Sequence, residues 1–134
     1  MEAKLKHLDF VQSVINRMAC NSFLIKGWSV TLVSAVFAIA VKDGNPGLVP
    51  VAYLPVLVFW FLDAYFLRQE RIYRKLYDAV RAKDESLIDF DLNATAFATE
   101  VQSYAGTVVS LTLRWFHGSI LLVVLAVNTI TYWR

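Results

Sequence analysis

Residues 50–83 read PVAYLPVLVFWFLDAYFLRQERIYRKLYDAVRAK, and this stretch decides the fold class. Its first half is apolar up to Asp63 and has the length and polarity of a membrane span. The second half is basic and carries Arg68, Arg71, Arg74, Lys75, Arg81 and Lys83. No proline or glycine lies between Val56 and Lys83, so the pattern predicts one helix that continues from the membrane into water.

The composition of the whole chain favours the same class. Of 134 residues, 57% are hydrophobic, which is too many for an ordinary soluble domain of this size. The charged residues, 18% of the chain, are concentrated in particular segments. A formal net charge of +2 is too small to indicate nucleic-acid binding. We therefore expect a single membrane domain with lipid as one of its partners and with no nucleic-acid partner.

The amino-terminal third predicts a cytoplasmic helix over residues 3–21 and a first span over residues 23–41. An apolar stripe indicates that the cytoplasmic helix packs on neighbouring helices, or that it lies flat on the inner leaflet. The stripe is Leu8, Val11, Ile15, Met18 and Ser22. Ala38-Ile39-Ala40 is similar to a signal-peptide cleavage site, but the apolar run before it is long enough to span, so we interpret it as a signal anchor. Cys20 is expected to be a small buried thiol, with lipidation as the alternative.

The middle and last thirds predict two more spans, over residues 50–67 and 117–133. Glycine, asparagine and proline in residues 42–47 indicate a sharp turn before the second span. Cytoplasmic helical segments are expected over residues 68–83 and 92–116, separated by an acidic loop over residues 84–91, with Asp91 or Asn93 as N-cap. A heptad-like seam predicts that residues 97–115 are one continuous helix. Its members are Phe97, Val101, Tyr104, Val108, Leu111 and Trp115.

The basic residues predict the orientation. Of the 13 lysines and arginines, only Lys42 and Arg134 are expected on the same side of the membrane as the turn at residues 42–47. The positive-inside rule therefore places the amino terminus in the cytoplasm and Arg134 outside. The expected fold is an all-α integral membrane protein of three long helices, running up, down and up. Each helix would have a transmembrane half and a cytoplasmic half.

No catalytic, metal-binding or cofactor-binding motif is present, so we expect no enzyme and no cofactor. The chain has one cysteine and two histidines, His7 and His117, which are far apart in sequence. Counting along each helix from the outer turn places Lys26, Asp63 and His117 at similar depth, with Arg114 about one turn lower. Ionisable residues at that depth are costly unless paired. The cluster is interpreted either as a structural ion pair between packed helices or as a gate at the mouth of an oligomeric pore.

Residues 21–40 (NSFLIKGWSVTLVSAVFAIA) and 53–81 (YLPVLVFWFLDAYFLRQERIYRKLYDAVR) resemble small multi-span proteins of the bacterial inner membrane. Some of these accompany anti-phage defence genes and are predicted to be pore-forming effectors. The resemblance covers the first two spans and the basic helix. It implies an oligomeric membrane effector or accessory subunit and assigns no functional residue.

Two functions follow as expectations. In the first, several copies assemble into a pore-like effector gated from the cytoplasmic helices, because three spans cannot enclose a pathway alone. In the second, the chain is a non-conducting anchor or adaptor that recruits a cytosolic protein. An intramembrane enzyme is least favoured, because a hydrolase of that kind needs polar groups deep in the bilayer on two spans, and the core of these spans is almost free of them. The candidate face for a partner or for lipid headgroups is Arg68, Arg71, Arg74, Lys75 and Arg81.

Overall fold

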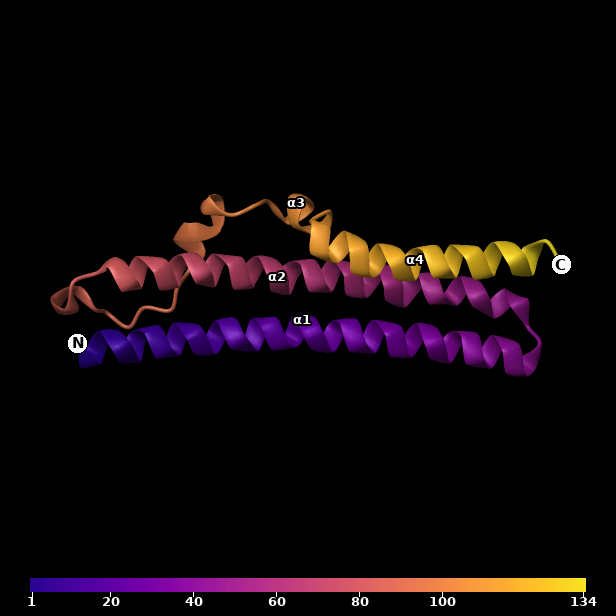
Figure 1. Ribbon diagram of the computed structural model, residues 1–134, viewed down its shortest axis with the longest axis horizontal. Helices are drawn as coiled ribbons and strands as arrows, with labels where there is room; N and C mark the ends of the chain where they lie inside the picture. The colour runs from indigo at the N-terminus through magenta and orange to yellow at the C-terminus, as the bar shows by residue number, and fades with distance from the viewer.

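The protein forms an elongated bundle of helices with no strand, described by a computed structural model for all residues 1–134 (Figure 1). Helix α1 covers Glu2–Asp43 and α2 covers Tyr53–Ala82, with a short 3-10 helix, η1 (Pro46–Ala52), between them. Helix α4 covers Leu111–Tyr132. Figure 1 shows α2 running back along α1, and α4 lying against the η1 end of α2, with the two termini at opposite ends of the bundle.

Three helical stretches are long and apolar enough to cross a membrane. They are Glu2–Asp43, Pro46–Ala82 and Leu111–Tyr132. At 1.5 Å per residue, α1 is about 63 Å long, roughly twice the thickness of a hydrocarbon core. The prediction of one helix through residues 56–82 is confirmed, because α2 is unbroken. Helices α1 and α2 therefore each have an apolar half and a polar half.

The turn between α1 and α2 has the local chemistry that its sequence predicts. Gly44 ends α1 in the left-handed conformation, with φ 61°, which a residue without Cβ adopts at little cost. The backbone N–H of Asn45 donates to the Ala40 carbonyl at 3.1 Å. The Asn45 side chain in turn accepts from the N–H of Gly47 at 3.0 Å. These bonds satisfy backbone groups that the end of a helix leaves unpaired.

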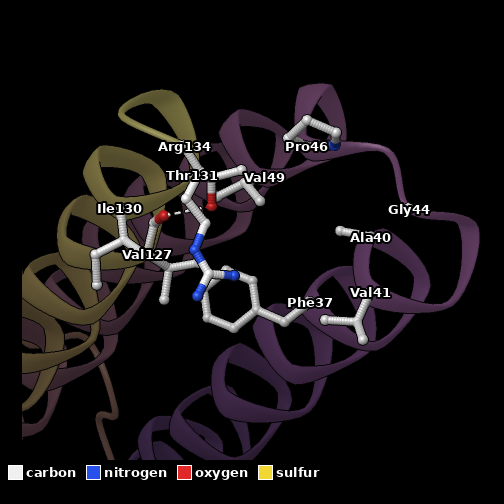
Figure 2. A pocket seen from close by; sticks show the side chains of 10 residues that line it. All are labelled: Phe37, Ala40, Val41, Gly44, Pro46, Val49, Val127, Ile130, Thr131 and Arg134. Carbon is white, nitrogen blue, oxygen red and sulfur yellow. Dashed lines mark hydrogen bonds between the residues drawn. The ribbon is translucent and has the colours of Figure 1, made fainter.

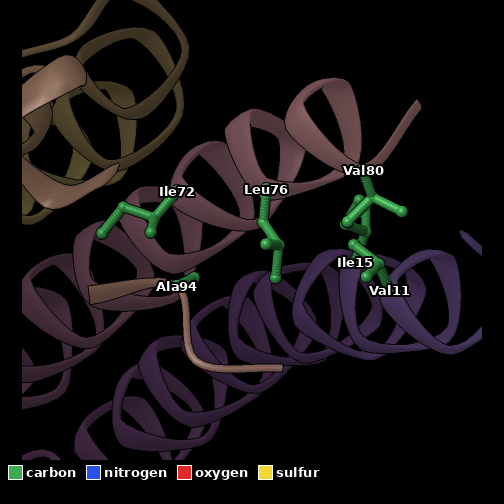
Figure 3. Close-up of a cluster of buried hydrophobic side chains, with 6 residues drawn as sticks. All are labelled: Val11, Ile15, Ile72, Leu76, Val80 and Ala94. Atoms are coloured by element: carbon green, nitrogen blue, oxygen red, sulfur yellow. The ribbon is translucent and has the colours of Figure 1, made fainter. Parts of the chain in front are cut away.

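The polar halves of α1 and α2 are held together by an apolar core (Figure 3). Val11 and Ile15 of α1 face Leu76 and Val80 of α2, with Ile72 and Ala94 in the same cluster. Val11 and Val80 are fully buried. The apolar stripe predicted for residues 3–21 is therefore a packing face. A second cluster joins the apolar halves and consists of Val33, Ala52, Val56 and Val124.

The predicted continuous helix over residues 92–116 is wrong. This stretch contains a 3-10 helix, η3 (Thr95–Glu100), a five-residue helix, α3 (Tyr104–Val108), and only then the start of α4. Short polar side chains bind the local backbone at the breaks: Asn93 accepts from the N–H of Thr95 at 3.1 Å, and Ser103 accepts from the N–H of Gly106 at 3.2 Å. Such bonds compete with helix continuation, and they outweigh the heptad-like spacing here.

The broken segment is held by side chains from α2. The guanidinium of Arg68 donates to the carbonyls of Ala98 and Gln102, at 3.1 and 3.2 Å. The indole N–H of Trp60 donates to the Val108 carbonyl at 2.8 Å. Backbone acceptors that a continuous helix would have paired internally are therefore paired with α2 instead.

We expect Arg68→Ala to release residues 95–103 without disturbing α2. Losing two hydrogen bonds from a charged donor at a partly exposed site is expected to cost on the order of 1–2 kcal/mol, confined to this segment. Amide hydrogen exchange should become faster in residues 95–103 and stay unchanged in 70–80. Lys75→Ala is the matched control, because Lys75 is exposed and forms no ion pair. Equal exchange in both variants would contradict the assigned role of Arg68.

Candidate functional site

Asp63 lies at the centre of a buried polar network. Its side chain is fully buried on α2. One carboxylate oxygen, Oδ2, accepts from the ammonium of Lys26 at 2.6 Å and from Nε2 of His117 at 2.7 Å. The other oxygen, Oδ1, accepts from the hydroxyl of Ser22. The carboxylate thus has three donors, which is the way buried charges are satisfied in proteins.

The network connects the three long helices. Ser22 and Lys26 are one turn apart on α1, and the Lys26 ammonium also donates to the Ser22 hydroxyl at 2.9 Å. Asp63 comes from α2 and His117 from α4. The predicted meeting of Lys26, Asp63 and His117 is therefore observed. Arg114 is the exception: it is exposed on the first turn of α4 and forms no ion pair, because the buried face of α4 passes through Leu113 and His117 and leaves Arg114 at its edge.

Aromatic rings close the network on one side. The ring of Trp60 stacks on His117 with centroids 5.9 Å apart and an interplanar angle of 15°. Phe116 meets His117 edge-on at 5.1 Å, and the Lys26 ammonium lies 5.8 Å from the centre of the Phe116 ring. Sequence reasoning missed Ser22, Trp60 and Phe116. The spacing Trp60–Asp63, three residues on one helix face, was the available signal for Trp60.

The arrangement neutralises charge inside a single protomer. Only the Lys26 side chain, 20% exposed, reaches the surface, whereas Asp63 and His117 are fully buried. His117 donates through Nε2, which leaves Nδ1 buried without a hydrogen-bond partner, and the hydroxyl of Ser29 is also unpartnered. No group of three or more histidine, cysteine or acidic side chains could hold a metal ion. The network can therefore fix the positions of the three helices, and it offers no ligand set for a metal.

The basic residues proposed as a partner face are partly used inside the protein. Arg68 binds two carbonyls, and Arg71 donates to the Gln102 side chain at 3.3 Å. Arg74 pairs with Glu70 at 2.8 Å, and Arg81 lies 3.8 Å from Asp78. Lys75 alone is exposed with no ion-pair partner. The candidate face is thus smaller than the sequence indicated.

A second distinctive surface lies at the polar end of the bundle. His7 is fully buried on α1, and its Nε2–H donates to the carbonyl of Asp91 at 2.8 Å. The residue before Asp91, Phe90, has a positive φ of 55°, which is rare and unfavourable for a bulky side chain. Its ring lies 5.7 Å from His7 and 6.1 Å from Phe10. Phe10 and Phe90 are 48% and 44% exposed, so together they form an apolar patch in a polar region.

The loop that carries Phe90 is also tied to the start of α1. Glu85 accepts hydrogen bonds from the backbone N–H groups of Ala3 and Lys4, at 3.0 and 3.3 Å. Its carboxylate lies 2.6 Å from the Met1 ammonium. The hydrogen bond from the Met1 ammonium, with those from the backbone, holds the pKa of Glu85 below its usual range. A carboxylate at this place also suits the positive end of the α1 dipole.

The expectation for Cys20 was wrong. Its side chain is exposed on α1 rather than buried, because it lies outside the stripe that packs on α2. Exposure alone assigns no modification to it.

Comparison with protein-family models, with curated proteins and with solved structures gave no match. The structure alone therefore assigns the class of protein: it is all-helical, with three helices long and apolar enough to cross a membrane.

Proposed function

We propose that this chain is a non-conducting anchor or adaptor in the bacterial inner membrane that recruits a cytosolic protein. Its apolar halves would span the bilayer three times, with the amino terminus inside and Arg134 outside. The basic residues on the polar side of the bundle support this orientation through the positive-inside rule. We propose the bacterial inner membrane as the location because residues 21–40 and 53–81 resemble small multi-span proteins of that membrane.

The outer surface of the apolar halves favours an anchor over a channel. It exposes large apolar side chains, among them Phe23, Leu24, Trp28, Leu57, Phe61 and Leu122. Hydroxyl groups on this surface bond to their own helices: Thr31 donates to the Gly27 carbonyl and Thr129 to the Leu125 carbonyl, each at 2.8 Å. The charged groups of the Asp63 network face inward. A surface of this kind suits lipid and provides few groups to line an aqueous path.

The observation that carries the adaptor proposal is the exposed patch of Phe10 and Phe90. Phe10 lies 13 residues before the first exposed apolar residue of the span, Phe23, so it stands about 20 Å along α1 from the start of the span. Lipid does not cover it at that distance. Exposed aromatic residues in a polar region mark protein interfaces, where they act as anchors of binding energy.

The backbone of Phe90 gives the patch a second property of an interface. Left-handed backbone at a bulky residue costs on the order of 1 kcal/mol, and the His7–Asp91 hydrogen bond and the Glu85 contacts hold the loop against that cost. Strain of this kind is concentrated at functional sites. We therefore place the partner's contact on Phe10 and Phe90.

Phe90→Gly is expected to separate stability from function. Glycine accepts a positive φ, so relief of about 1 kcal/mol of strain should offset the lost ring contacts and leave the stability nearly unchanged. Partner binding should fall strongly, because one of two anchors is gone. The experiment is photo-crosslinking in native membranes from probes at position 10 or 90, with a probe at exposed Asn16 as the matched control.

The expected result is one discrete crosslink to a cytosolic protein from positions 10 and 90, absent from position 16. Phe90→Gly should abolish the crosslink from position 10 while the protein melts as the wild type does. Crosslinks only to lipid, or only to another copy of the chain, would contradict the adaptor proposal.

A homo-oligomeric pore is the second candidate, and two glycines favour it. A Cβ added at Gly27 of α1 or at Gly118 of α4 would meet no atom within 4 Å, so both positions face open space. Small residues on a span let another helix approach closely. The test combines oligomer mass in detergent with ion flux from proteoliposomes. A stable oligomer that releases ions would establish the pore, and a monomer or dimer without flux would exclude it.

A further inference from the structure

An apolar groove separates α1 from α4 near the carboxy-terminal end of the bundle. It opens into a cavity of about 510 Å³ at the turn that follows α1 (Figure 2). The apolar side chains that line this cavity are Phe37, Ala40, Val41, Val49, Val127 and Ile130. This cavity is open to the outside, because its lining residues Val41 and Arg134 are exposed.

The groove continues along both helices towards the Asp63 network. A second cavity of about 270 Å³ lies between the same two helices and is lined by Ser34 of α1 and Ile120 and Val123 of α4. Phe37 lines both cavities, so they are adjacent parts of one groove. From Val30 to Val41 the groove follows α1 for about 16 Å. This is a long, narrow shape with apolar walls.

One cationic side chain lies at the outer end of the groove. In Figure 2 the side chain of Arg134 extends from the end of α4 across the cavity. No acidic side chain lines either cavity. The hydroxyl of Thr131 is already bonded to the Val127 carbonyl at 2.6 Å. The guanidinium of Arg134 is therefore the group at this end that is free to bind a ligand.

We propose that the groove binds one phospholipid with an anionic headgroup, with an acyl chain against Phe37 and the phosphate at Arg134. A planar guanidinium can bind a phosphate through two parallel hydrogen bonds. An acyl chain is unbranched, so it fits the narrow apolar groove. A helix from a second copy would instead set the Arg134 charge against an apolar surface and remove its hydration. The inference requires that α1 and α4 lie in a bilayer, and it holds for an adaptor and for a pore alike.

Native mass spectrometry of the protein in an uncharged detergent tests the proposal, with phosphatidylglycerol and phosphatidylcholine as probes. The wild type should bind one phosphatidylglycerol more tightly than one phosphatidylcholine. Arg134→Gln should weaken phosphatidylglycerol binding about tenfold and phosphatidylcholine binding less, because both lipids carry a phosphate but the choline ammonium offsets the phosphate charge. Ser34→Phe, which places a ring in the groove from an exposed position, should weaken both.

Two matched variants control for the loss of any charge and for the addition of any ring outside the groove. Lys42→Gln removes a charge at the same end of the bundle, and Ala38→Phe adds a ring at an exposed position that lines neither cavity. Both should bind as the wild type does. Equal binding of the two lipids with no effect of Arg134→Gln would overturn the headgroup assignment. A dimer whose population falls in Ser34→Phe would overturn the lipid in favour of a second copy. Failure of the wild type to bind either lipid would overturn the groove as a lipid site, whereas the membrane orientation is tested separately by cysteine labelling.

Discussion

Asp63→Ala is expected to lower the free energy of unfolding by about 3–5 kcal/mol, because it leaves buried donors without their acceptor. The Asp63 carboxylate receives bonds from Ser22, Lys26 and His117, which belong to the other two long helices. Lys26 is 20% exposed and can extend its ammonium towards headgroups, whereas His117 is fully buried and has no alternative partner. The loss should therefore appear chiefly as a detached α4.

Two companion variants grade this effect. Asp63→Asn keeps an acceptor oxygen and is expected to cost on the order of 1–3 kcal/mol. Lys26→Met leaves the fully buried Asp63 carboxylate without its cation and should cost at least as much as Asp63→Ala. The measurement is denaturant unfolding of the purified protein in micelles, with hydrogen exchange to locate the change. If all three variants were as stable as the wild type, the network would not hold the helices together.

Leu76→Ala is expected to cost about 2–4 kcal/mol, and the loss should be confined to the polar half of the bundle. Leu76 is 6% exposed and packs in the cluster with Val11, Ile15, Ile72 and Val80 (Figure 3). In water this apolar core is the main force that keeps the polar halves of α1 and α2 together. Removing three carbons from its centre should open that half while the apolar half stays folded.

Hydrogen exchange resolves the two halves. Protection should fall in residues 5–18 and 70–82 and remain in 28–40 and 53–66. Leu87→Ala is the control, because Leu87 is 64% exposed and should change neither region. A uniform loss of protection along α1 would mean that the bundle unfolds as one cooperative unit, contrary to the two-part organisation described here.

Those residues of the site whose depth depends only on regular helix geometry could be predicted from the sequence. Lys26, Asp63 and His117 could be set at one depth because α1, α2 and α4 are regular and their outer ends are marked by a turn or an aromatic residue. Depth does not specify direction around the helix axis. Arg114 was grouped with the cluster by its three-residue spacing from His117, but the buried face of α4 passes through Leu113 and His117 and leaves Arg114 exposed at its edge.

The segment before α4 could not be predicted from spacing. The seam from Phe97 to Trp115 satisfied a heptad pattern, yet Asn93 and Ser103 bond to their local backbone and interrupt the helix. The decisive contacts come from far along the chain, since Arg68 and Trp60 supply donors to the freed carbonyls. A periodic pattern carries no information about such partners.

The positive φ of Phe90 could not be predicted from the sequence either. Bulky residues rarely adopt a positive φ, and nothing in the acidic loop of residues 84–91 singles out this position. The conformation depends on His7, more than 80 residues earlier, which fixes the neighbouring carbonyl. The candidate docking surface therefore became visible only once α1 and the loop were placed side by side.

Site-directed cysteine labelling tests most directly whether the apolar halves cross a membrane with the polar half inside. In a Cys20→Ser background, single cysteines replace Asn45 in the turn after α1 and Asp78 on the polar half of α2, both exposed positions. A membrane-impermeant maleimide is applied to spheroplasts. We expect Asn45→Cys to react at once and Asp78→Cys only after the membrane is permeabilised. Immediate reaction of Asp78→Cys, or of both variants alike, would contradict the orientation and with it the proposed anchor.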